Sequence, residues 1–417
     1  MFTQIDGKLH VEGVSVEEIA KIGTPVYITS KEKLEKNIHS YQEAFPQAKI
    51  LYAVKANNNI SLMKVISRSC GADVFSGGEL YVALLAGFKP EEILFNGNSK
   101  TDQDIQYGVK AGVKFSVDSF DELHTISAIA QQQGKDVKIA FRINPDISPD
   151  THPKIATGLK KSKFGIPWVQ VMDAYKEAVE LSNVTPVGIH CHIGSQITEL
   201  EPFVEVLNRL FDVAAWIEDL GVSVEFLDMG GGLGIDYEGK GVPSPSDLAE
   251  NLMPVFNHRV AELSSNPQLW LEPGRSIIGD TTILLTGVNS VKRAYKNFAS
   301  VDAGFNLLIR PVMYDAYHRV SVANKMDIPD EDTYTIVGPI CESGDAIAED
   351  RRLPRLEKGD LIAVYDSGAY GFAMSSQYNG RMRCPEVLVN GDNWYVIRDR
   401  ENYYDIVGKQ IITDLDY

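Results

Sequence analysis

The first two-thirds of the chain alternates short apolar runs with longer amphipathic segments. The runs have the length of strands, and between them apolar residues recur at steps of three and four, as in 78–86 and 202–220, which predicts helices. The predicted strands are eight, at residues 50–56, 72–76, 93–96, 114–118, 137–143, 187–193, 224–229 and 269–271. Eight strand–helix units over about 250 residues predict a parallel (β/α)8 barrel. The alternative, a doubly wound open sheet, usually has only five or six strands.

The pattern changes after Arg275. Short runs rich in β-branched and aromatic residues are broken by Gly, Asp and Asn, with few helical patterns between them, which predicts strands. They lie at 282–291, 298–301, 334–337, 361–365, 386–389 and 394–397. We therefore expect an α/β protein whose barrel domain, residues 25–275, is followed by an all-β, sandwich- or barrel-like domain. That second domain would contain residues 276–417 and be joined by residues 1–24.

Composition and charge exclude several classes of protein. The 417 residues are 44% hydrophobic and 23% charged, and the net charge is −17 because 57 acidic residues outnumber 40 Lys and Arg. Such a chain lacks the broad basic surface that nucleic acids or anionic membranes require. No apolar run reaches the length of a membrane span, and the first residues have no apolar segment of a signal peptide. The four cysteines have no zinc-like or CxxC spacing, so we expect reduced thiols and a cytoplasmic protein.

Unusual residues stand where the predicted barrel strands end. The first strand ends at Lys55, the sixth at His190 and His192, the seventh at Gly230, and the eighth at Glu272. Active sites of such barrels lie at the carboxyl ends of the strands. We therefore expect these groups to meet on one rim.

Lys55 is the first candidate for chemistry. A single amine delivered by an apolar strand into a barrel mouth predicts a desolvated lysine with a lowered pKa, suited to forming a Schiff base. The alternative is an ordinary solvated lysine at a strand end.

The glycines of residues 230–234 indicate an anion site. They do not fit the dinucleotide fingerprint, because its third glycine would fall at Ile235. Consecutive glycines at a strand end let backbone N–H groups approach an anion closely. Together with the turn at Gly274 and Arg275, they match the phosphate site often found after strands seven and eight. A purely structural tight turn is the alternative.

Glu272 precedes Pro273, which holds its backbone extended. A carboxylate at this place could hold a protonated pyridine nitrogen. His190 and His192 are two apart on a strand and point the same way. A two-histidine zinc site lacks a third ligand at a convincing spacing, so we expect no metal; a ring packed over a planar cofactor, or a core histidine, is favoured.

Six motifs together resemble a known family. They are residues 52–57, 190–196, 230–234, 272–275, the Cys-Glu-Ser-Gly-Asp of 341–345 and the Gly-Ala-Tyr-Gly of 368–371. In this order they are similar to the pyridoxal 5'-phosphate (PLP) decarboxylases of the alanine-racemase fold, above all to the branch that acts on diaminopimelate. The resemblance extends from about Thr24 to the last strands.

The resemblance implies PLP as cofactor. Lys55 would hold it as a Schiff base, His192 would stack on its ring, and Glu272 would pair with its ring nitrogen. Its phosphate would be bound by Ser195, Gly231, Gly232, Gly274, Arg275 and Tyr370.

The resemblance also implies a substrate site. Cys341 would donate a proton to the carbanion, and Glu342 would bind a substrate amino group. The distal carboxylate would be bound by Arg275, Arg310 and Tyr314, with Tyr370 nearby. Such enzymes are homodimers in which the loop 341–345 completes the neighbouring subunit's site.

The reaction that follows is the conversion of meso-2,6-diaminopimelate to L-lysine and CO2. The same chemistry on ornithine, arginine, carboxynorspermidine or a carrier-bound amino acid is one alternative, although the cation of Arg310 favours a distal carboxylate. An alanine racemase would lack the 341–345 loop, and a non-catalytic PLP-binding protein would lack the β domain. A PLP-free sugar-phosphate enzyme would explain the phosphate site but not Lys55 with Glu272.

Overall fold

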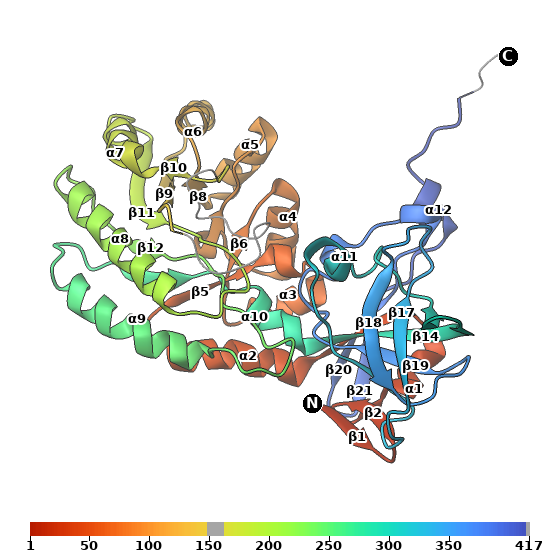
Figure 1. Cartoon of the computed structure of the whole chain (residues 1–417). Coiled ribbons are helices and arrows are strands. Elements are labelled where there is room, and N and C mark those ends of the chain that lie inside the picture. The colour runs from red at the N-terminus through yellow and green to blue at the C-terminus, as the bar shows by residue number, and fades with distance from the viewer. Residues whose placement is uncertain (148–161, 414–417) are drawn as a thin grey trace. The chain divides into compact units, whose positions relative to one another are not determined.

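The computed structural model describes residues 1–147 and 162–413, which form two compact units (Figure 1). The barrel unit contains the described residues of Glu35–Asp236 and Lys240–Ile277. The β unit contains Met1–Leu34, Tyr237–Gly239 and the described chain from Ile278 onward. The barrel unit thus begins at Glu35, whereas the sequence-based division begins at residue 25.

The barrel unit is built on a closed ring of parallel strands. They are β5 (Lys49–Ala53), β6 (Gly71–Val74), β7 (Ile93–Phe95), β8 (Lys114–Val117), β9 (Val137–Asn144), β11 (Val184–His190), β12 (Phe226–Asp228) and β13 (Gln268–Leu271). Each pairs with the next, β13 pairs with β5, and β8 pairs with β9, which closes the ring. All eight strands expected from the sequence are present, and the predicted parallel barrel is confirmed.

Helices follow most of the barrel strands. They are α2 (Lys31–Ala44), α3 (Ile60–Ile66), α4 (Gly77–Ala86), α5 (Asp102–Ala111), α6 (Phe120–Gln133), α7 (Val171–Val179), α8 (Glu201–Glu218), α9 (Pro245–Val260) and α10 (Arg275–Ile278). Local sequence fixes several ends: Ser76 and Ser119 side chains accept N–H bonds at the starts of α4 and α6, and Gly87 and Gly134 take left-handed conformations at their ends. No helix in residues 1–147 or 162–413 is long and apolar enough to cross a membrane.

The β unit surrounds the long strand β14 (Thr282–Arg293). Its sheet has the order β18-β17-β15-β14-β4-β20-β21, and β19 pairs with both β14 and β16. The strands are β4 (Val26–Ser30), β15 (Asn297–Val301), β16 (Val320–Val322), β17 (Asp332–Val337), β18 (Ala346–Leu353), β19 (Leu361–Val364), β20 (Glu386–Asn390) and β21 (Asn393–Arg398). Of these eight strands and β14, six match predicted strands, whereas β4, β16 and β18 were not predicted. The expected separate β-sheet domain is confirmed.

The N-terminal strands join this unit. β1 (Phe2–Ile5), β2 (Lys8–Val11) and β3 (Val14–Ser15) form a small antiparallel sheet. Their apolar side chains, including Leu9 and Val11, share a buried cluster with Ile283 and Val387 of the larger sheet. Short helices α1 (Val16–Ile19), α11 (Arg310–Tyr314) and α12 (Tyr403–Val407) complete the unit.

Aromatic packing fills the interior of the barrel. Phe226 and Trp270 stack with ring centroids 3.8 Å apart, and both side chains are buried. Gly188 of β11 lies against Phe226, so closely that a Cβ atom at this position would overlap the ring. The barrel can therefore hold this aromatic pair only because residue 188 has no side chain.

We expect Gly188→Ala to lower the free energy of unfolding by about 1–3 kcal/mol, because the added methyl group overpacks a closed core. Urea denaturation followed by circular dichroism measures the change. Gly78→Ala is the matched control, because a Cβ there would meet only the Ser76 hydroxyl at 3.6 Å. An unchanged Gly188→Ala midpoint would contradict the inferred tight packing.

Candidate active site

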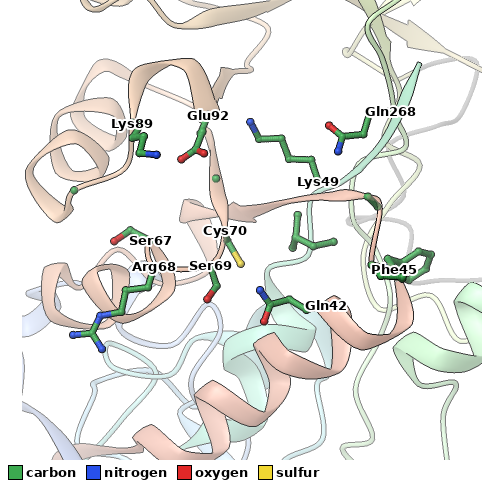
Figure 2. A pocket seen from close by; sticks show the side chains of 15 residues that line it. Gln42, Phe45, Lys49, Ser67, Arg68, Ser69, Cys70, Lys89, Glu92 and Gln268 are labelled. Carbon is green, nitrogen blue, oxygen red and sulfur yellow. The ribbon is translucent and has the colours of Figure 1, made fainter. Parts of the chain in front are cut away.

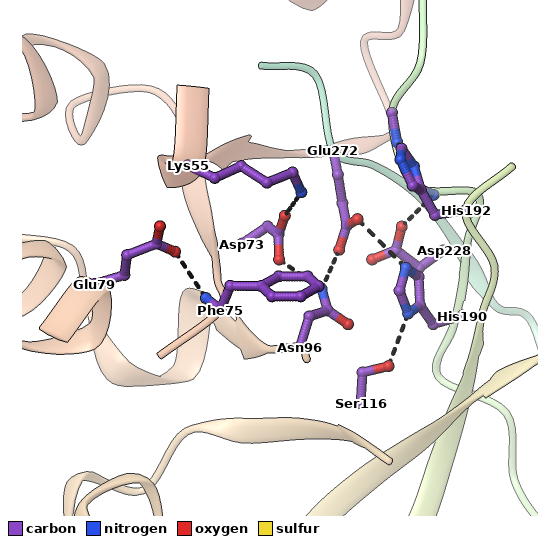
Figure 3. A network of polar contacts seen from close by, with 12 residues as sticks. Lys55, Asp73, Phe75, Glu79, Asn96, Ser116, His190, His192, Asp228 and Glu272 are labelled. Atoms are coloured by element: carbon purple, nitrogen blue, oxygen red, sulfur yellow. Dashed lines mark hydrogen bonds and ion pairs between the residues drawn. The ribbon is translucent and has the colours of Figure 1, made fainter. Parts of the chain in front are cut away.

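The site lies at the carboxyl ends of the barrel strands, where polar side chains from seven strands converge (Figure 3). In strand order around the barrel they are Lys55 after β5, Asp73 in β6, Asn96 after β7, Ser116 in β8, His190 in β11, Asp228 in β12 and Glu272 after β13. Six of them, all except Lys55, are buried. The expectation that Lys55, His190 and Glu272 meet on one rim is met within this unit.

Lys55 is paired with a carboxylate. Its ammonium lies 2.9 Å from Asp73 Oδ2, and its side chain is 33% exposed while that of Asp73 is 1% exposed. The ring of Phe75 lies 5.1 Å from the same nitrogen. Lys55 is therefore not the desolvated amine expected from the sequence, because β6 supplies a counterion that the sequence analysis did not consider.

Asn96 connects the two carboxylates nearest to this lysine. Its Nδ2 donates to Asp73 Oδ1 at 2.6 Å and to Glu272 Oε1 at 2.7 Å. An amide that donates to both stabilises two buried carboxylates that would otherwise repel each other.

Glu272 is held on its other oxygen by a histidine. His190 Nε2 lies 3.3 Å from Glu272 Oε2, and His190 Nδ1 lies 2.7 Å from Ser116 Oγ. Burial alone would raise the pKa of Glu272, but His190 and Lys55 outweigh it and lower the pKa to about 2. The site thus contains a buried carboxylate that stays ionised.

Asp228 behaves in the opposite way. Burial, together with the nearby charge of Glu272, holds its pKa well above the ordinary range, although the Gly230 N–H donates to Oδ1 at 2.8 Å. Two adjacent buried carboxyls cannot both ionise cheaply. Glu272 therefore carries the charge and Asp228 the proton.

His192 is an uncharged ring. Burial and the neighbouring Lys55 hold its pKa well below the usual value, and its Nδ1 accepts the Gly231 N–H at 3.2 Å. A neutral imidazole in this place can lie against a planar apolar face without the cost of burying a charge.

One group of side chains in the described part of the chain is a candidate metal site. His190, Asp228 and Glu272 each offer a ligand atom, and these atoms lie within 4.8 Å of one another. A third ligand is not apparent from spacing in the sequence, because the three residues lie at the ends of different strands. Both oxygens of Glu272 already face Asn96 and His190, and Asp228 holds a proton, so the arrangement fits a hydrogen-bonded cluster better than a cation site.

Glycines let the strand ends approach one another. A Cβ on Gly231 would overlap the Glu272 carbonyl, and one on Gly232 (φ +123°) would lie 2.7 Å from the Gly194 carbonyl. Close backbone packing at the strand ends is therefore a sufficient reason for Gly231 and Gly232. It does not exclude an anion site, because the N–H groups of Gly232 and Gly274 have no hydrogen-bond partner among the described residues.

Arg275 and Ser195 lie beside these amides. Arg275 Nη2 donates to Ser195 Oγ at 2.9 Å. Two backbone N–H groups that are unpartnered within residues 1–147 and 162–413, a hydroxyl and a guanidinium at the ends of β11, β12 and β13 are suited to a phosphate.

A second group of predicted residues lies in the β unit. Cys341 is the exposed one of the four cysteines, and Asn379 Nδ2 donates to its sulfur at 3.2 Å. The Tyr378 hydroxyl donates to Glu342 Oε1 at 2.7 Å. Glu342 and Tyr378 border a hollow that Phe305 and Val312 also line.

Arg310 and Tyr314 begin and end α11. The Arg310 guanidinium lies 2.8 Å from His318 Nε2 and 4.4 Å from the Tyr237 ring centroid. His318 Nδ1 faces the Tyr365 carbonyl at 2.8 Å, so it carries the proton and Nε2 accepts from Arg310. His318 is therefore a neutral partner that holds the cation in place.

Tyr370, the remaining predicted residue, has a left-handed backbone conformation with φ +57°. It lies in the loop after β19, where the Gly368 N–H donates to the Gly279 carbonyl. Asp73, Asn96, Ser116, Tyr378 and Asn379 were not singled out from the sequence. The strand-end rule that found Lys55 would also have found Asn96, which ends the predicted strand 93–96, but not Asp73, which lies near the start of the predicted strand 72–76.

Another hollow, of about 570 Å³, lies at the opposite end of the barrel, where β5, β6 and β13 begin (Figure 2). It is lined by Lys49, Arg68 and Lys89 among others, but Lys49 and Arg68 extend toward different sides of it. Arg68 and Lys89 follow the ends of α3 and α4, where cations stabilise helix carbonyl groups. A favourable interaction with helix ends is enough to explain Arg68 and Lys89 at this place without a ligand.

Comparison with known proteins agrees with this geometry. Residues 31–279 match the family described as pyridoxal-dependent decarboxylase, pyridoxal binding domain. The chain is 64% identical over 99% of both chains to a diaminopimelate decarboxylase of Archaeoglobus fulgidus, and 44% identical to that of Aquifex aeolicus over 96% of this chain and 95% of that one. The chain belongs to the pyridoxal-dependent decarboxylases.

A solved structure of the same kind of enzyme has the same fold. The diaminopimelate decarboxylase of Methanocaldococcus jannaschii in complex with L-lysine superposes with a TM-score of 0.94 at 38% identity, covering 99% of this chain and 98% of that one. As a member of this family, the protein uses PLP as its cofactor. An ionised carboxylate at Glu272, a neutral imidazole at His192, and N–H groups of Gly232 and Gly274 without a hydrogen-bond partner in the described chain are chemically suited to such a cofactor.

We expect Asp228→Asn to stabilise the protein relative to the wild type as the pH rises. The folded-state pKa of Asp228 is raised, so unfolding releases a proton above the unfolded value of about 3.9 and is favoured at higher pH. Asparagine has no proton to release on unfolding. The free energy of unfolding of Asp228→Asn minus that of the wild type should therefore grow by up to about 1.4 kcal/mol per pH unit.

Urea denaturation at several pH values between 4 and 7 measures this difference. Asp121→Asn, at an exposed position on α6, is the control and should show a flat difference. An equally flat curve for Asp228→Asn would mean that Asp228 is ionised in the folded protein.

Proposed function

We propose that this protein decarboxylates meso-2,6-diaminopimelate to L-lysine and CO2, the last step of lysine biosynthesis. The full-length similarity to enzymes of that name, one of them solved with L-lysine, supports the substrate. The observation that carries the chemistry is the buried Glu272 carboxylate, which stays ionised because Asn96 and His190 face its two oxygens.

The barrel residues would hold the cofactor. Lys55 would bind its aldehyde carbon, Glu272 would hold its ring nitrogen protonated, and His192 would lie against the ring face. The phosphate would be bound by Ser195, Gly231, Gly232, Gly274, Arg275 and Tyr370. When bound, PLP supplies an electron sink for the electron pair left as the Cα–carboxylate bond breaks.

The chain's own groups perform the remaining tasks. The Lys55 amine accepts and returns protons while the substrate amine takes its place at the cofactor. Asp73 stabilises the positive charge of the Lys55 ammonium. Cys341 delivers a proton to Cα after CO2 leaves, so the products are L-lysine and CO2 and the thiol is reprotonated from water. Its exposed sulfur on a loop is accessible for this task.

The β unit would determine which amino acid is accepted. Arg310 and Tyr314, with Arg275, would bind the distal carboxylate, Glu342 the distal amino group, and Tyr370 would complete this end. The guanidinium of Arg310 is fixed by His318 and Tyr237 before any ligand binds. A substrate without the distal carboxylate would lack a charged partner for the buried Arg310 guanidinium, which is a basis for discrimination.

We also propose a cytoplasmic homodimer in which the 341–345 loop serves the partner's site. Cys341 is exposed in the single chain, and the neighbouring Val312 and Tyr378 are exposed apolar side chains suited to an interface. The four free cysteines fit a reducing compartment, and the charge of −17 disfavours nucleic acids and membranes as partners.

Adding PLP to the purified protein should produce an absorbance band at about 420 nm, and adding meso-diaminopimelate should change the band as lysine accumulates. A protein that takes up PLP but forms no lysine would exclude this substrate. One that never takes up PLP would overturn the proposal as a whole.

Arg310→Ala should lower kcat/KM for meso-diaminopimelate at least about 100-fold, because a buried charge partner of the substrate is lost. Arg310→Lys keeps the positive charge but loses the two-pronged guanidinium, so its kcat/KM should lie between those of the wild type and Arg310→Ala. Arg293→Ala, at an exposed site of the same unit, is the control. Near-normal kcat/KM in a folded Arg310→Ala protein would remove Arg310 from the substrate site.

Lys55→Ala and Cys341→Ala should each be inactive alone but recover activity when co-expressed. A mixed dimer with shared sites has one intact site, so random assembly should restore about a quarter of wild-type activity. Sedimentation velocity tests the dimer itself. No recovery in a preparation proven to contain mixed dimers would mean that each site is built from one chain.

A further inference from the structure

We infer that His190, anchored by Ser116, is a positioning residue that keeps the proton of the cofactor–Glu272 pair on the ring nitrogen. The inference rests on the proposed function and deepens it: it assigns a role to two residues that touch neither substrate nor cofactor in that proposal. The observation behind it is the chain Ser116–His190–Glu272, which runs across three strand ends of the barrel (Figure 3).

The geometry determines which imidazole nitrogen carries a proton. Nε2 faces the ionised Glu272 Oε2 at 3.3 Å, and a bare nitrogen lone pair there would repel the carboxylate. Nε2 therefore carries hydrogen. With Nε2–H directed at Glu272, the Ser116 hydroxyl can donate to Nδ1 at 2.7 Å.

A buried lysine fixes the backbone on which this arrangement depends. The Lys100 ammonium, which has no exposed side-chain surface, donates to the Ser116 carbonyl at 2.9 Å and to the Gly97 carbonyl at 2.6 Å, and pairs with Glu122. Gly97 directly follows Asn96, the donor to the other Glu272 oxygen. One cation thus places both groups that hold Glu272.

The consequence concerns where a shared proton lies. Between a carboxylate and a pyridine nitrogen, the proton stays on the nitrogen only while the carboxylate is the weaker base. The Asn96 hydrogen bond at Oε1 and the close approach of His190 Nε2 to Oε2 weaken Glu272 as a base. Without the His190 contact, the carboxylate becomes the stronger base and can take the proton, leaving a neutral ring that is a poorer electron sink.

Other charges around Glu272 do not replace this effect. Asp73 and Asp228 face it from β6 and β12, Lys55 from the end of β5, and His192 from the end of β11. Asp228 is protonated and His192 neutral, while the charge of Lys55 is shared with Asp73. The group that lies 3.3 Å from Oε2 is His190 Nε2.

The test uses holoenzyme carrying PLP labelled with 15N in its ring. In wild type the ring nitrogen should stay protonated across about pH 6–9, as read from its 15N chemical shift. In His190→Phe the signal should move to that of an unprotonated ring within this range, and kcat should fall about 100-fold with a smaller change in KM. Ser116→Ala should shift in the same direction to a smaller extent.

Two further variants separate positioning from structure. His190→Gln restores an N–H toward Glu272 and should recover the protonated signal, which a purely structural role for the imidazole would not produce. Ser127→Ala, which removes a comparable serine hydrogen bond on α6, should leave the signal unchanged. Should His190→Phe fail to fold, His190→Gln and Ser116→Ala decide the outcome.

Wild-type ring signals in both folded His190→Phe and Ser116→Ala would overturn the inference while leaving the decarboxylase function intact. A wild-type protein that binds no labelled PLP would instead overturn the proposed function.

Discussion

The structure of the site depends on one constraint: a negative charge at Glu272 must survive at the bottom of a closed barrel. Removing a carboxylate from water raises its pKa, and here that effect has to be reversed by neighbours. Each neighbour comes from a different strand, Asn96 from the end of β7 and His190 from β11. A parallel barrel suits this task because it brings all its strand ends to one rim.

The same constraint explains the remaining charges. Two more carboxyls, Asp73 and Asp228, lie close to Glu272, and an ionised trio would be strongly destabilising. Asp73 is paired with Lys55 and Asp228 keeps its proton, so the cluster carries few uncompensated charges. The glycines then have an indirect electrostatic role, because Gly231 lets the Glu272 backbone approach without collision.

The sequence predicted most of the fold because its strands are short apolar runs between polar segments. It failed where that signal is absent: β18 reads Ala-Ile-Ala-Glu-Asp-Arg-Arg-Leu, half charged, because it is an edge strand that pairs only with β17. The residues of β4 fell inside the predicted barrel domain, because the local pattern does not reveal which strands pair. In the structure β4 pairs with β14 and β20, both distant in sequence. Lys55 was recognised, but its partner Asp73 lies on the next strand, and that pairing changes its environment.

The two groups of site residues differ in a way that matches their tasks. Apart from Lys55, the barrel groups are buried, and their polar contacts are in place before a ligand arrives. Their dipoles and charges are therefore already oriented, which is the condition for strong electrostatic stabilisation. Cys341 and Glu342 are exposed on a loop, with hydrogen bonds only to Asn379 and Tyr378. A proton donor must be close to Cα only after CO2 has left, whereas an electron sink must be ready beforehand. The order of the chemical steps therefore explains why the groups around the electron sink lie in the rigid barrel interior, whereas the proton donor lies on an accessible loop.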